Sequence, residues 1–240
     1  MFLTFKDRPS SSPYIERVWC SHTHTGGVFY SMAEGSLELV VTQLAGLCRV
    51  TLRGPVTRAA PIVCPANGEW IAIRFRVGTH FTQRPTALLM DHNDIDFPTV
   101  RDKRFWFAGA RWEIPTFENA EGFVQKLARE GAIAIDPTVP ETIEGDRPVL
   151  SRRSVQRHFL RVTGMTHALF RQIQRARYAA KLLCGGTSIL DVVHGAGYFD
   201  QAHLTRSLTR LVGPTPTAIL RNEVQLSFSY EHEPAPAPQG

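Results

Sequence analysis

Arginine side chains recur in the second half of the chain at a spacing that places them on one face of a helix. Arg157 and Arg161 lie four residues apart, and Arg206 and Arg210 repeat this spacing 49 positions later. Gln156 lies beside the first pair. A guanidinium pairs bidentately with guanine O6 and N7, and a glutamine amide pairs with adenine N6 and N7. The chemistry offered by this pattern is therefore recognition of base edges in a major groove.

The same shift repeats the residues that would position these side chains. Apolar residues at i, i+4 and i+7, a capping residue before them and a glycine after them recur together. The matching pairs are Ser151 and Asp200, Val155 and Leu204, Phe159 and Leu208, Val162 and Leu211, Gly164 and Gly213, and Thr166 and Thr215. The repeat predicts two helices, each with one buried stripe. The residues expected to face outward are Arg153, Arg157 and Arg161 on the first helix and Ala202, Thr205, Arg206 and Arg210 on the second.

Charge is concentrated around this repeat. The chain of 240 residues carries a net charge of +5, yet residues 147–221 hold twelve Lys and Arg against only Asp191 and Asp200. A positive field of this density favours a polyanion partner such as nucleic acid or a membrane surface. The outward faces lack the Trp, Phe and Lys residues that a membrane-surface helix would present.

Supporting elements surround each of the two helices. Residues 188–193 form a capping box before an apolar run that leads through Gly195 and Gly197 to the second helix, which predicts a helix-turn-helix. Residues 139–150 contain two prolines and a glycine, so the first supporting helix must be short or irregular. Residues 166–184 predict a linking helix of about 27 Å. We expect its Arg171 and Arg175 to contact phosphates.

The first hundred residues are typical of short strands in a barrel or sandwich. Residues 70–77 alternate apolar and polar side chains, as in a half-buried strand. Residues 36–44 and 47–53 are two further strand candidates, separated by Ala45 and Gly46, and predict a hairpin. Residues 117–130 predict a helix that begins after Thr116 and ends before Gly131.

These motifs resemble the DNA-binding domain of AraC/XylS-type transcriptional regulators. The resemblance covers 75 to 85 residues and includes R-x-F…G in the first unit, R-x3-A-x2-LL in the linking helix, the Gly-Tyr turn and the closing G-x-T-P. It implies that two helices read adjacent major grooves. The residues it assigns to reading are Arg152, Arg153, Gln156 and Arg157 on the first helix and Gln201, Ala202, His203 and Arg206 on the second. Ala202 lacks a hydrogen-bonding group, which favours the first unit as the source of specificity.

The N-terminal part is similar to the β-rich domains that precede such DNA-binding domains in some members of the family. The similar stretches are YIERVW at residues 14–19 and EWIAIRFRVG at residues 69–78. This resemblance implies a small-molecule effector, a homodimer, or both. It does not identify the effector, the operator or the direction of regulation.

A metal-dependent, cupin-like enzyme with an accessory helical domain is the alternative. His22, His24 and Glu34 are ligand types, but Glu34 lies ten residues after His24, whereas a cupin site places the carboxylate four or five residues after the second histidine. Neither a nucleophile motif nor a phosphate-binding loop occurs. Cys20, Cys48, Cys64 and Cys184 are far apart in the sequence, which disfavours a disulfide scaffold or a zinc ribbon.

We therefore expect an α+β protein: a β-rich, barrel-like or sandwich-like domain followed by an all-α tandem helix-turn-helix domain. The expected units are a sensor or dimerisation domain at residues 1–112, a helical connector at 113–135, the DNA-binding domain at 136–222 and a disordered tail at 223–240. We expect a cytoplasmic regulator that binds double-stranded DNA, with no catalytic residues, metal or cofactor. No window is apolar enough for a signal peptide or a membrane span.

Overall fold

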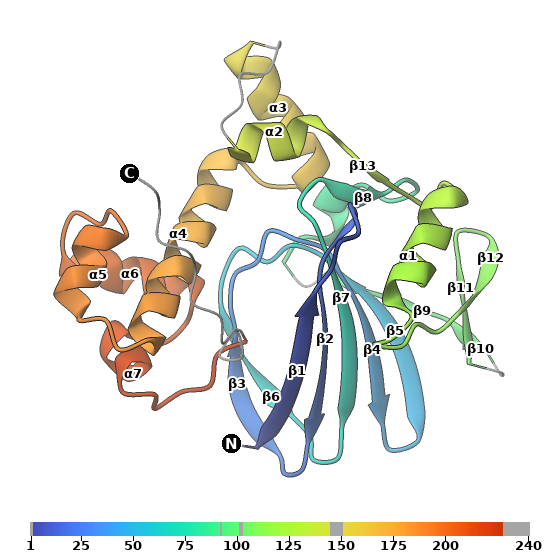
Figure 1. Ribbon diagram of the computed structural model, residues 1–240, viewed down its shortest axis with the longest axis horizontal. Helices are drawn as coiled ribbons and strands as arrows, with labels where there is room; N and C mark the ends of the chain where they lie inside the picture. The colour runs from blue at the N-terminus through green and yellow to red at the C-terminus, as the bar shows by residue number, and fades with distance from the viewer. Residues whose placement is uncertain (1, 92, 101–102, 145–150, 228–240) are drawn as a thin grey trace.

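The computed structural model describes residues 2–91, 93–100, 103–144 and 151–227. Strands dominate as far as residue 113, and helices dominate from residue 120 onward (Figure 1). The expected α+β class, with a β-rich N-terminal region and a helical C-terminal region, is confirmed.

A six-stranded antiparallel sheet forms the centre of the β-rich region. Its order is β1 (Leu3–Pro9), β2 (Ile15–Thr23), β7 (Glu69–Phe75), β4 (Glu38–Leu44), β5 (Leu47–Arg53) and β9 (Ile95–Phe97). The hairpin between β4 and β5 is confirmed. Its turn residues Ala45 and Gly46 both have positive φ, 50° and 78°, as a two-residue type I′ turn requires.

Shorter sheets and a 3-10 turn surround the central sheet. These elements are β3 (Gly27–Ser31) paired with β6 (Ala60–Cys64), β8 (Thr79–Phe81) paired with β13 (Ile133–Ile135), β10 (Thr99–Val100), β11 (Arg104–Phe107) and β12 (Ala110–Glu113) in one sheet, and η1 (Thr86–Leu89). Aromatic residues of β11 and β12 belong to the same hydrophobic core as the central sheet.

Strand β7 is buried on both faces, so the expectation of a half-buried strand is wrong. Ile73 and Phe75 face the apolar core, as their alternation predicts. Ala72, on the opposite face, is also fully buried, and Arg74 is only 9% exposed. Arg74 tolerates burial because acidic side chains bind it, as described below.

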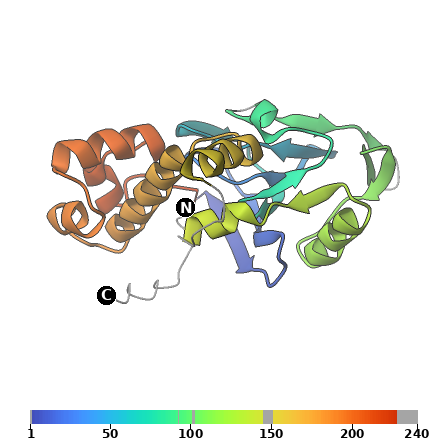
Figure 2. The ribbon, with the colours of Figure 1, turned by 90° about the horizontal axis from the view of Figure 1, so that it is seen from above.

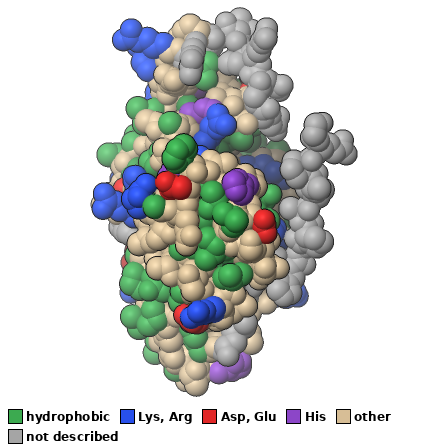
Figure 3. Space-filling model, turned by 90° about the vertical axis from the view of Figure 1, so that its left-hand side faces the viewer, with side chains coloured by type: hydrophobic (Ala, Val, Ile, Leu, Met, Phe, Trp, Pro, Cys, Tyr) green, Lys and Arg blue, Asp and Glu red, His purple; other side chains and the backbone are tan. Residues whose placement is uncertain are grey.

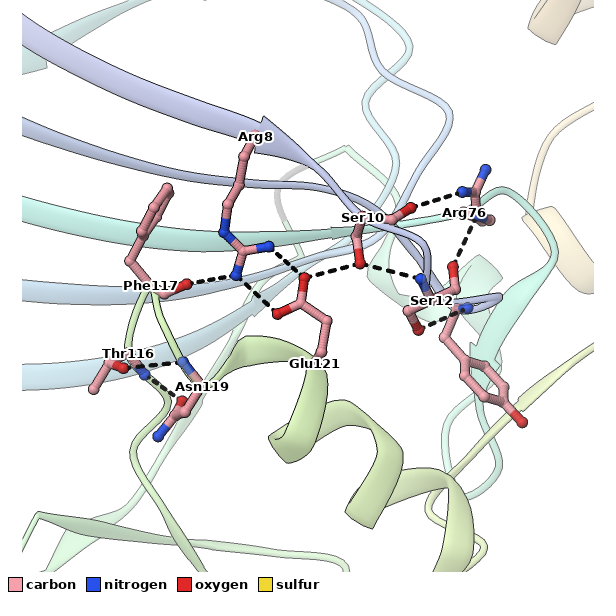
Figure 4. Close-up of polar contacts among 9 residues, drawn as sticks. Arg8, Ser10, Ser12, Arg76, Thr116, Phe117, Asn119 and Glu121 are labelled. Carbon is pink, nitrogen blue, oxygen red and sulfur yellow. Dashed lines mark hydrogen bonds and ion pairs between the residues drawn. The ribbon is translucent and has the colours of Figure 1, made fainter.

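Helix α1 (Ala120–Arg129) packs into the β-rich core. Phe123, Val124 and Leu127 share a hydrophobic cluster with the central sheet. Outside this core, Glu121 accepts hydrogen bonds from Arg8 on β1 and from Ser10, as Figure 4 shows. Arg8 also donates to the carbonyl oxygen of Phe117 at 2.7 Å, so it binds both α1 and the segment before it. Within the expected connector, α1 thus contacts the central sheet, and the boundaries at residues 113 and 135 remain a prediction.

The C-terminal region is helical. Its elements are α2 (Thr138–Glu144), α3 (Arg152–Thr163), α4 (His167–Cys184), α5 (Ile189–Gly195), α6 (Gln201–Leu211) and α7 (Pro216–Leu220). The predicted linking helix is α4, and the predicted short supporting helix is α2, which is described only as far as residue 144. Residues 145–150 of the expected supporting segment lie outside the described residues. Within the described segments, no helix is long and apolar enough to cross a membrane.

The β-rich region and the helical region lie side by side in Figure 2. The loop after β3 packs against the helices and so holds the two regions together. Met32 and Ala33, in this loop, are 2% and 0% exposed and belong to the hydrophobic core of the helices. The backbone N–H of Ala33 donates to the carbonyl oxygen of Leu211 at 2.8 Å, and that of Ala59 donates to Arg210 at 3.0 Å. The C-terminal end of α6 is therefore hydrogen-bonded to the β-rich region.

Glu34, the next residue of this loop, forms a buried ion pair across the two regions. Its Oε2 lies 3.0 Å from Nη1 of Arg177 on α4 and 3.3 Å from Nη1 of Arg74 on β7. Nε of Arg74 also donates to Glu38 at 2.8 Å. Burial alone would raise the pKa of Glu34, but Arg177 and Arg74 outweigh it and hold that pKa below its usual value.

The segment after α7 returns to the β-rich region. Tyr30 on β3 donates its N–H to the carbonyl oxygen of Gln225 at 2.9 Å and accepts from the N–H of Ser227 at 3.1 Å. Leu226, between them, is 1% exposed. The expected disordered tail is thus corrected for residues 223–227, which sequence composition could not show because their partner is Tyr30; residues 228–240 lie outside the described residues.

The contacts of Glu121 predict a pH-dependent contribution to stability. Its hydrogen bond with Arg8 lowers the pKa of Glu121 from 4.5 to about 2. The stabilisation is therefore present above about pH 4.5 and is lost as the pH falls toward 2. Because about a third of the carboxyl is exposed, we expect Glu121→Gln to lower the free energy of unfolding by only about 1 kcal/mol at pH 7.

Urea denaturation at pH 7 and at pH 3 measures this difference. The gap between the wild type and Glu121→Gln should shrink at the lower pH. Glu118→Gln changes a neighbouring exposed carboxylate and is the control, which should show a smaller effect. A gap that is the same at both pH values would contradict the assignment.

The Glu34 ion pair predicts a larger effect. Glu34→Gln keeps the side-chain size but leaves two buried guanidiniums without their shared anion, so we expect the free energy of unfolding to fall by about 3–5 kcal/mol. Adding Arg177→Met should recover part of this loss, because Arg74 retains Glu38. The matched control is Glu223→Gln, which breaks an exposed pair with Arg221 and should cost less than about 1 kcal/mol. Equal losses for Glu34→Gln and Glu223→Gln in urea denaturation would refute the buried link.

Candidate nucleic-acid interface

Helices α3 and α6 are the two elements that carry the predicted reading residues. Each begins at the predicted cap: the Ser151 hydroxyl accepts from the N–H of Ser154, and the Asp200 carboxylate accepts from the N–H of His203 at 2.6 Å. Gly164 follows α3 with a φ of 78°. The 49-residue repeat therefore corresponds to two copies of one capped helix.

The outward face of α3 matches the expected one. Phe159 is 1% exposed in the helical core, with Val155 and Val162 partly buried beside it. The side chains of this helix that are exposed to solvent include Arg153, Gln156, Arg157 and Arg161. The side chain of Arg152 lies outside the described part of the structure.

The outward face of α6 carries two of the predicted arginines. Leu204, Leu208 and Leu211 are buried under it, at 0% to 2% exposure. The exposed predicted residues are Gln201, Ala202, Arg206 and Arg210. His203 is only partly exposed: its Nδ1 accepts from the N–H of Phe199 at 3.4 Å, and its ring packs edge-on against Tyr198. The structure thus gives His203 a role within the turn, and its contact with bases remains a prediction.

Helix α4 holds the two reading helices on one core. Phe170 and Ile173, near its N-terminal end, and Ala180 and Leu183, near its C-terminal end, belong to one cluster with the buried residues of α3 and α6. Thr166 caps α4 by accepting from the N–H of Leu169. The 18-residue helix α4 therefore determines the separation of α3 and α6.

Arg175 on α4 is bound inside the second helix-turn-helix. Its guanidinium lies 4.7 Å from the centre of the Tyr198 ring and donates to the carbonyl oxygen of Gly197 at 3.3 Å. The Tyr198 hydroxyl in turn lies 3.0 Å from Ser207 on α6. Arg175 thus positions the turn before α6, and its contact with a phosphate remains a prediction. Arg171, one helical turn earlier, is exposed.

The flank of α3 is bound to the end of the β-rich region. Nε2 of His158 lies 2.6 Å from the carboxylate of Asp136, which follows β13, and Nη2 of Arg161 lies 2.9 Å from Nδ1 of the same histidine. Burial of Asp136 opposes its ionisation, but hydrogen bonds from Thr138 and His158 outweigh burial and lower the pKa of Asp136. The orientation of α3 therefore depends on this contact as well as on the helical core.

Residues 151–221, all of them in the described part of the chain, contain only two acidic residues, and both lie at helix N-termini. Asp200 caps α6, and Asp191 accepts from the hydroxyl of Ser188 at the start of α5, so both serve helix N-termini. Viewed from the side of the helical region, Lys and Arg side chains lie at the upper and left margins, beside exposed hydrophobic ones (Figure 3). This surface suits a polyanion partner.

The residues considered for a metal site are engaged differently. Glu34 binds two arginines, as described above, and the rings of His22 and His24 pack edge-to-face with their centres 4.5 Å apart. Among the described residues, no three His, Cys, Asp or Glu side chains converge in a way that could hold a metal ion. The ion pair between Glu34 and Arg177 was not predicted from the sequence. The one local signal of it is the charged residue Arg74 inside an apolar strand.

Comparison with known proteins agrees with this geometry. Residues 147–222 match the family described as helix-turn-helix domain. The HTH-type transcriptional regulator RipA of Corynebacterium glutamicum is 34% identical over 85 residues, which are 35% of this chain and 25% of RipA. The chain thus matches about a quarter of the length of this relative. No solved structure matches the chain. Residues 147–222 therefore match a helix-turn-helix domain, in agreement with the resemblance to AraC/XylS-type regulators in the sequence.

Proposed function

We propose that this protein is a sequence-specific DNA-binding transcription regulator. The observation that carries the proposal is the pair of capped helices, α3 and α6, which share one core with α4 and expose Arg and Gln side chains. Helices of this kind fit the major groove, and two of them on one rigid support can enter successive grooves on one side of the duplex. The proposed activity is binding, with no chemical reaction.

We divide the exposed side chains of the helical region into two groups. Arg153, Gln156 and Arg157 on α3, and Gln201 and Arg206 on α6, are proposed to contact bases. Arg171 on α4, with Arg161 and Arg210 near the C-terminal ends of the reading helices, is proposed to contact phosphates. The first group then determines which sequence is bound, and the second supplies affinity that weakens with salt.

The β-rich region is proposed to sense a small-molecule effector. An open depression of about 380 Å³ on the central sheet supports this role; it combines charged and aromatic side chains, among them Lys6, His22, Trp70 and Phe117. The buried link through Glu34 gives an effector bound there a physical route to the helices. Val28 and Val63, paired across β3 and β6 and 53% and 77% exposed, offer an apolar surface for a second copy of the chain.

The test of the proposal begins with selection of duplexes from a random DNA pool by the full chain. A shared sequence among the selected duplexes is the expected result, with affinity that falls as salt rises. A pool that stays random after repeated selection would refute sequence-specific binding.

Arg157→Ala then tests the assignment of base contacts. We expect it to weaken binding to the selected duplex by about 1–3 kcal/mol, to relax specificity at one base pair, and to affect a scrambled duplex much less. Fluorescence anisotropy titrations with both duplexes measure this difference.

Arg171→Ala is the matched comparison, because it removes an exposed arginine from the same region. It should weaken both duplexes about equally and lower the slope of log affinity against log salt by about 1. Equal losses on both duplexes for Arg157→Ala would instead make Arg157 a phosphate contact.

A further inference from the structure

Phe199 is an aromatic residue that the fold leaves in solvent beside the second reading helix. Its side chain is 91% exposed, the largest value among the exposed large hydrophobic side chains of the described residues. It lies between Tyr198, which is 5% exposed, and Asp200, which caps α6.

The exposure of Phe199 runs against the usual packing at a helix start. A hydrophobic residue just before the cap commonly packs on the fourth residue of the helix, which here is Leu204. Leu204 is fully buried without it. The backbone around Phe199 is nevertheless held: its N–H donates to His203 at 3.4 Å, and Tyr198 is fixed by Arg175 and Ser207. The ring is therefore presented outward from a rigid turn.

A second apolar group lies in the first turn of the same helix. Ala202 is exposed and lies four residues before Arg206, on the outward face opposite Leu204. Recognition helices contact base edges mainly with their N-terminal residues. Phe199 and Ala202 thus place a ring and a methyl group, neither able to hydrogen-bond, at the end of α6 that meets the bases.

We propose that Phe199 and Ala202 select thymine in the half-site read by α6, through contact with its C5-methyl group. This methyl is the apolar feature that distinguishes thymine in the major groove, and Phe and Ala side chains are suited to contact it. The inference rests on the proposed DNA-binding function. It also revises the expectation from sequence that Ala202 makes α6 the less specific helix, because a methyl contact specifies a base without a hydrogen bond.

The test replaces thymine by uracil, which keeps base pairing and removes only the methyl group. In the duplex selected by the full chain, each thymine is replaced singly and the affinity is measured by anisotropy. We expect at least one position in one half-site where the wild type loses about fourfold in affinity, the value that corresponds to burial of one methyl-sized group. Phe199→Ala should reduce the preference for thymine over uracil at that position, because only Ala202 is left to contact the methyl group.

Three comparisons make the result specific. Arg157→Ala, on α3, should keep the preference for thymine at that position, which locates the contact on α6. Leu47→Ala removes an exposed apolar residue at the distant β4–β5 turn and should change neither affinity nor the preference. Thermal denaturation of Phe199→Ala should match the wild type, because the ring packs on little in the free protein.

Two results would overturn the inference and leave the proposed function standing. One is a wild type that binds specifically yet tolerates uracil at every position. The other is a Phe199→Ala variant that weakens thymine and uracil duplexes equally, which would place the ring against the sugar-phosphate backbone. A selection that returns no shared sequence would overturn both proposals.

Discussion

The packing of the helical region against the β-rich region depends on the ion pairs that Glu34 forms with Arg74 and Arg177. The Glu34 carboxylate lies between Arg74 of the sheet and Arg177 of α4, and removing it would leave both guanidiniums without their shared anion. The neighbouring residues Met32 and Ala33 complete the hydrophobic core of the helices. The β-rich region and the helices are therefore held together both by these ion pairs and by a shared hydrophobic core.

Within the helical region, the function of each polar residue follows from what binds it. Arg175 and Arg177 lie on the same helix as Arg171, but one is held by Tyr198 and the other by Glu34, while Arg171 remains exposed. Arg171 is the one of these three whose side chain is exposed. Helix α4 therefore contributes fewer exposed arginines to the positive surface than its sequence contains.

Local patterns in the sequence predicted much of this structure. The caps Ser151 and Asp200, the linking helix and the β4–β5 hairpin depend on neighbouring residues, so their signals are local. The burial of Arg74, the use of Glu34 and the docking of residues 224–227 depend on partners that are distant in the sequence. Neither periodicity nor composition identifies such distant partners. The sequence alone therefore offers Glu34 as a candidate metal ligand and predicts that a tail begins at residue 223.

Because residues 224–227 return to β3, the helical region is bound to the β-rich region at both of its ends. At its N-terminal end, His158 is bound to Asp136. At its C-terminal end, Tyr30 forms two backbone hydrogen bonds with the segment after α7. A domain tethered by one linker can swivel, but one fastened at two points has little rotational freedom unless a fastening opens. A change in the direction of α3 and α6 relative to the β-rich region would thus require at least one of these contacts to break.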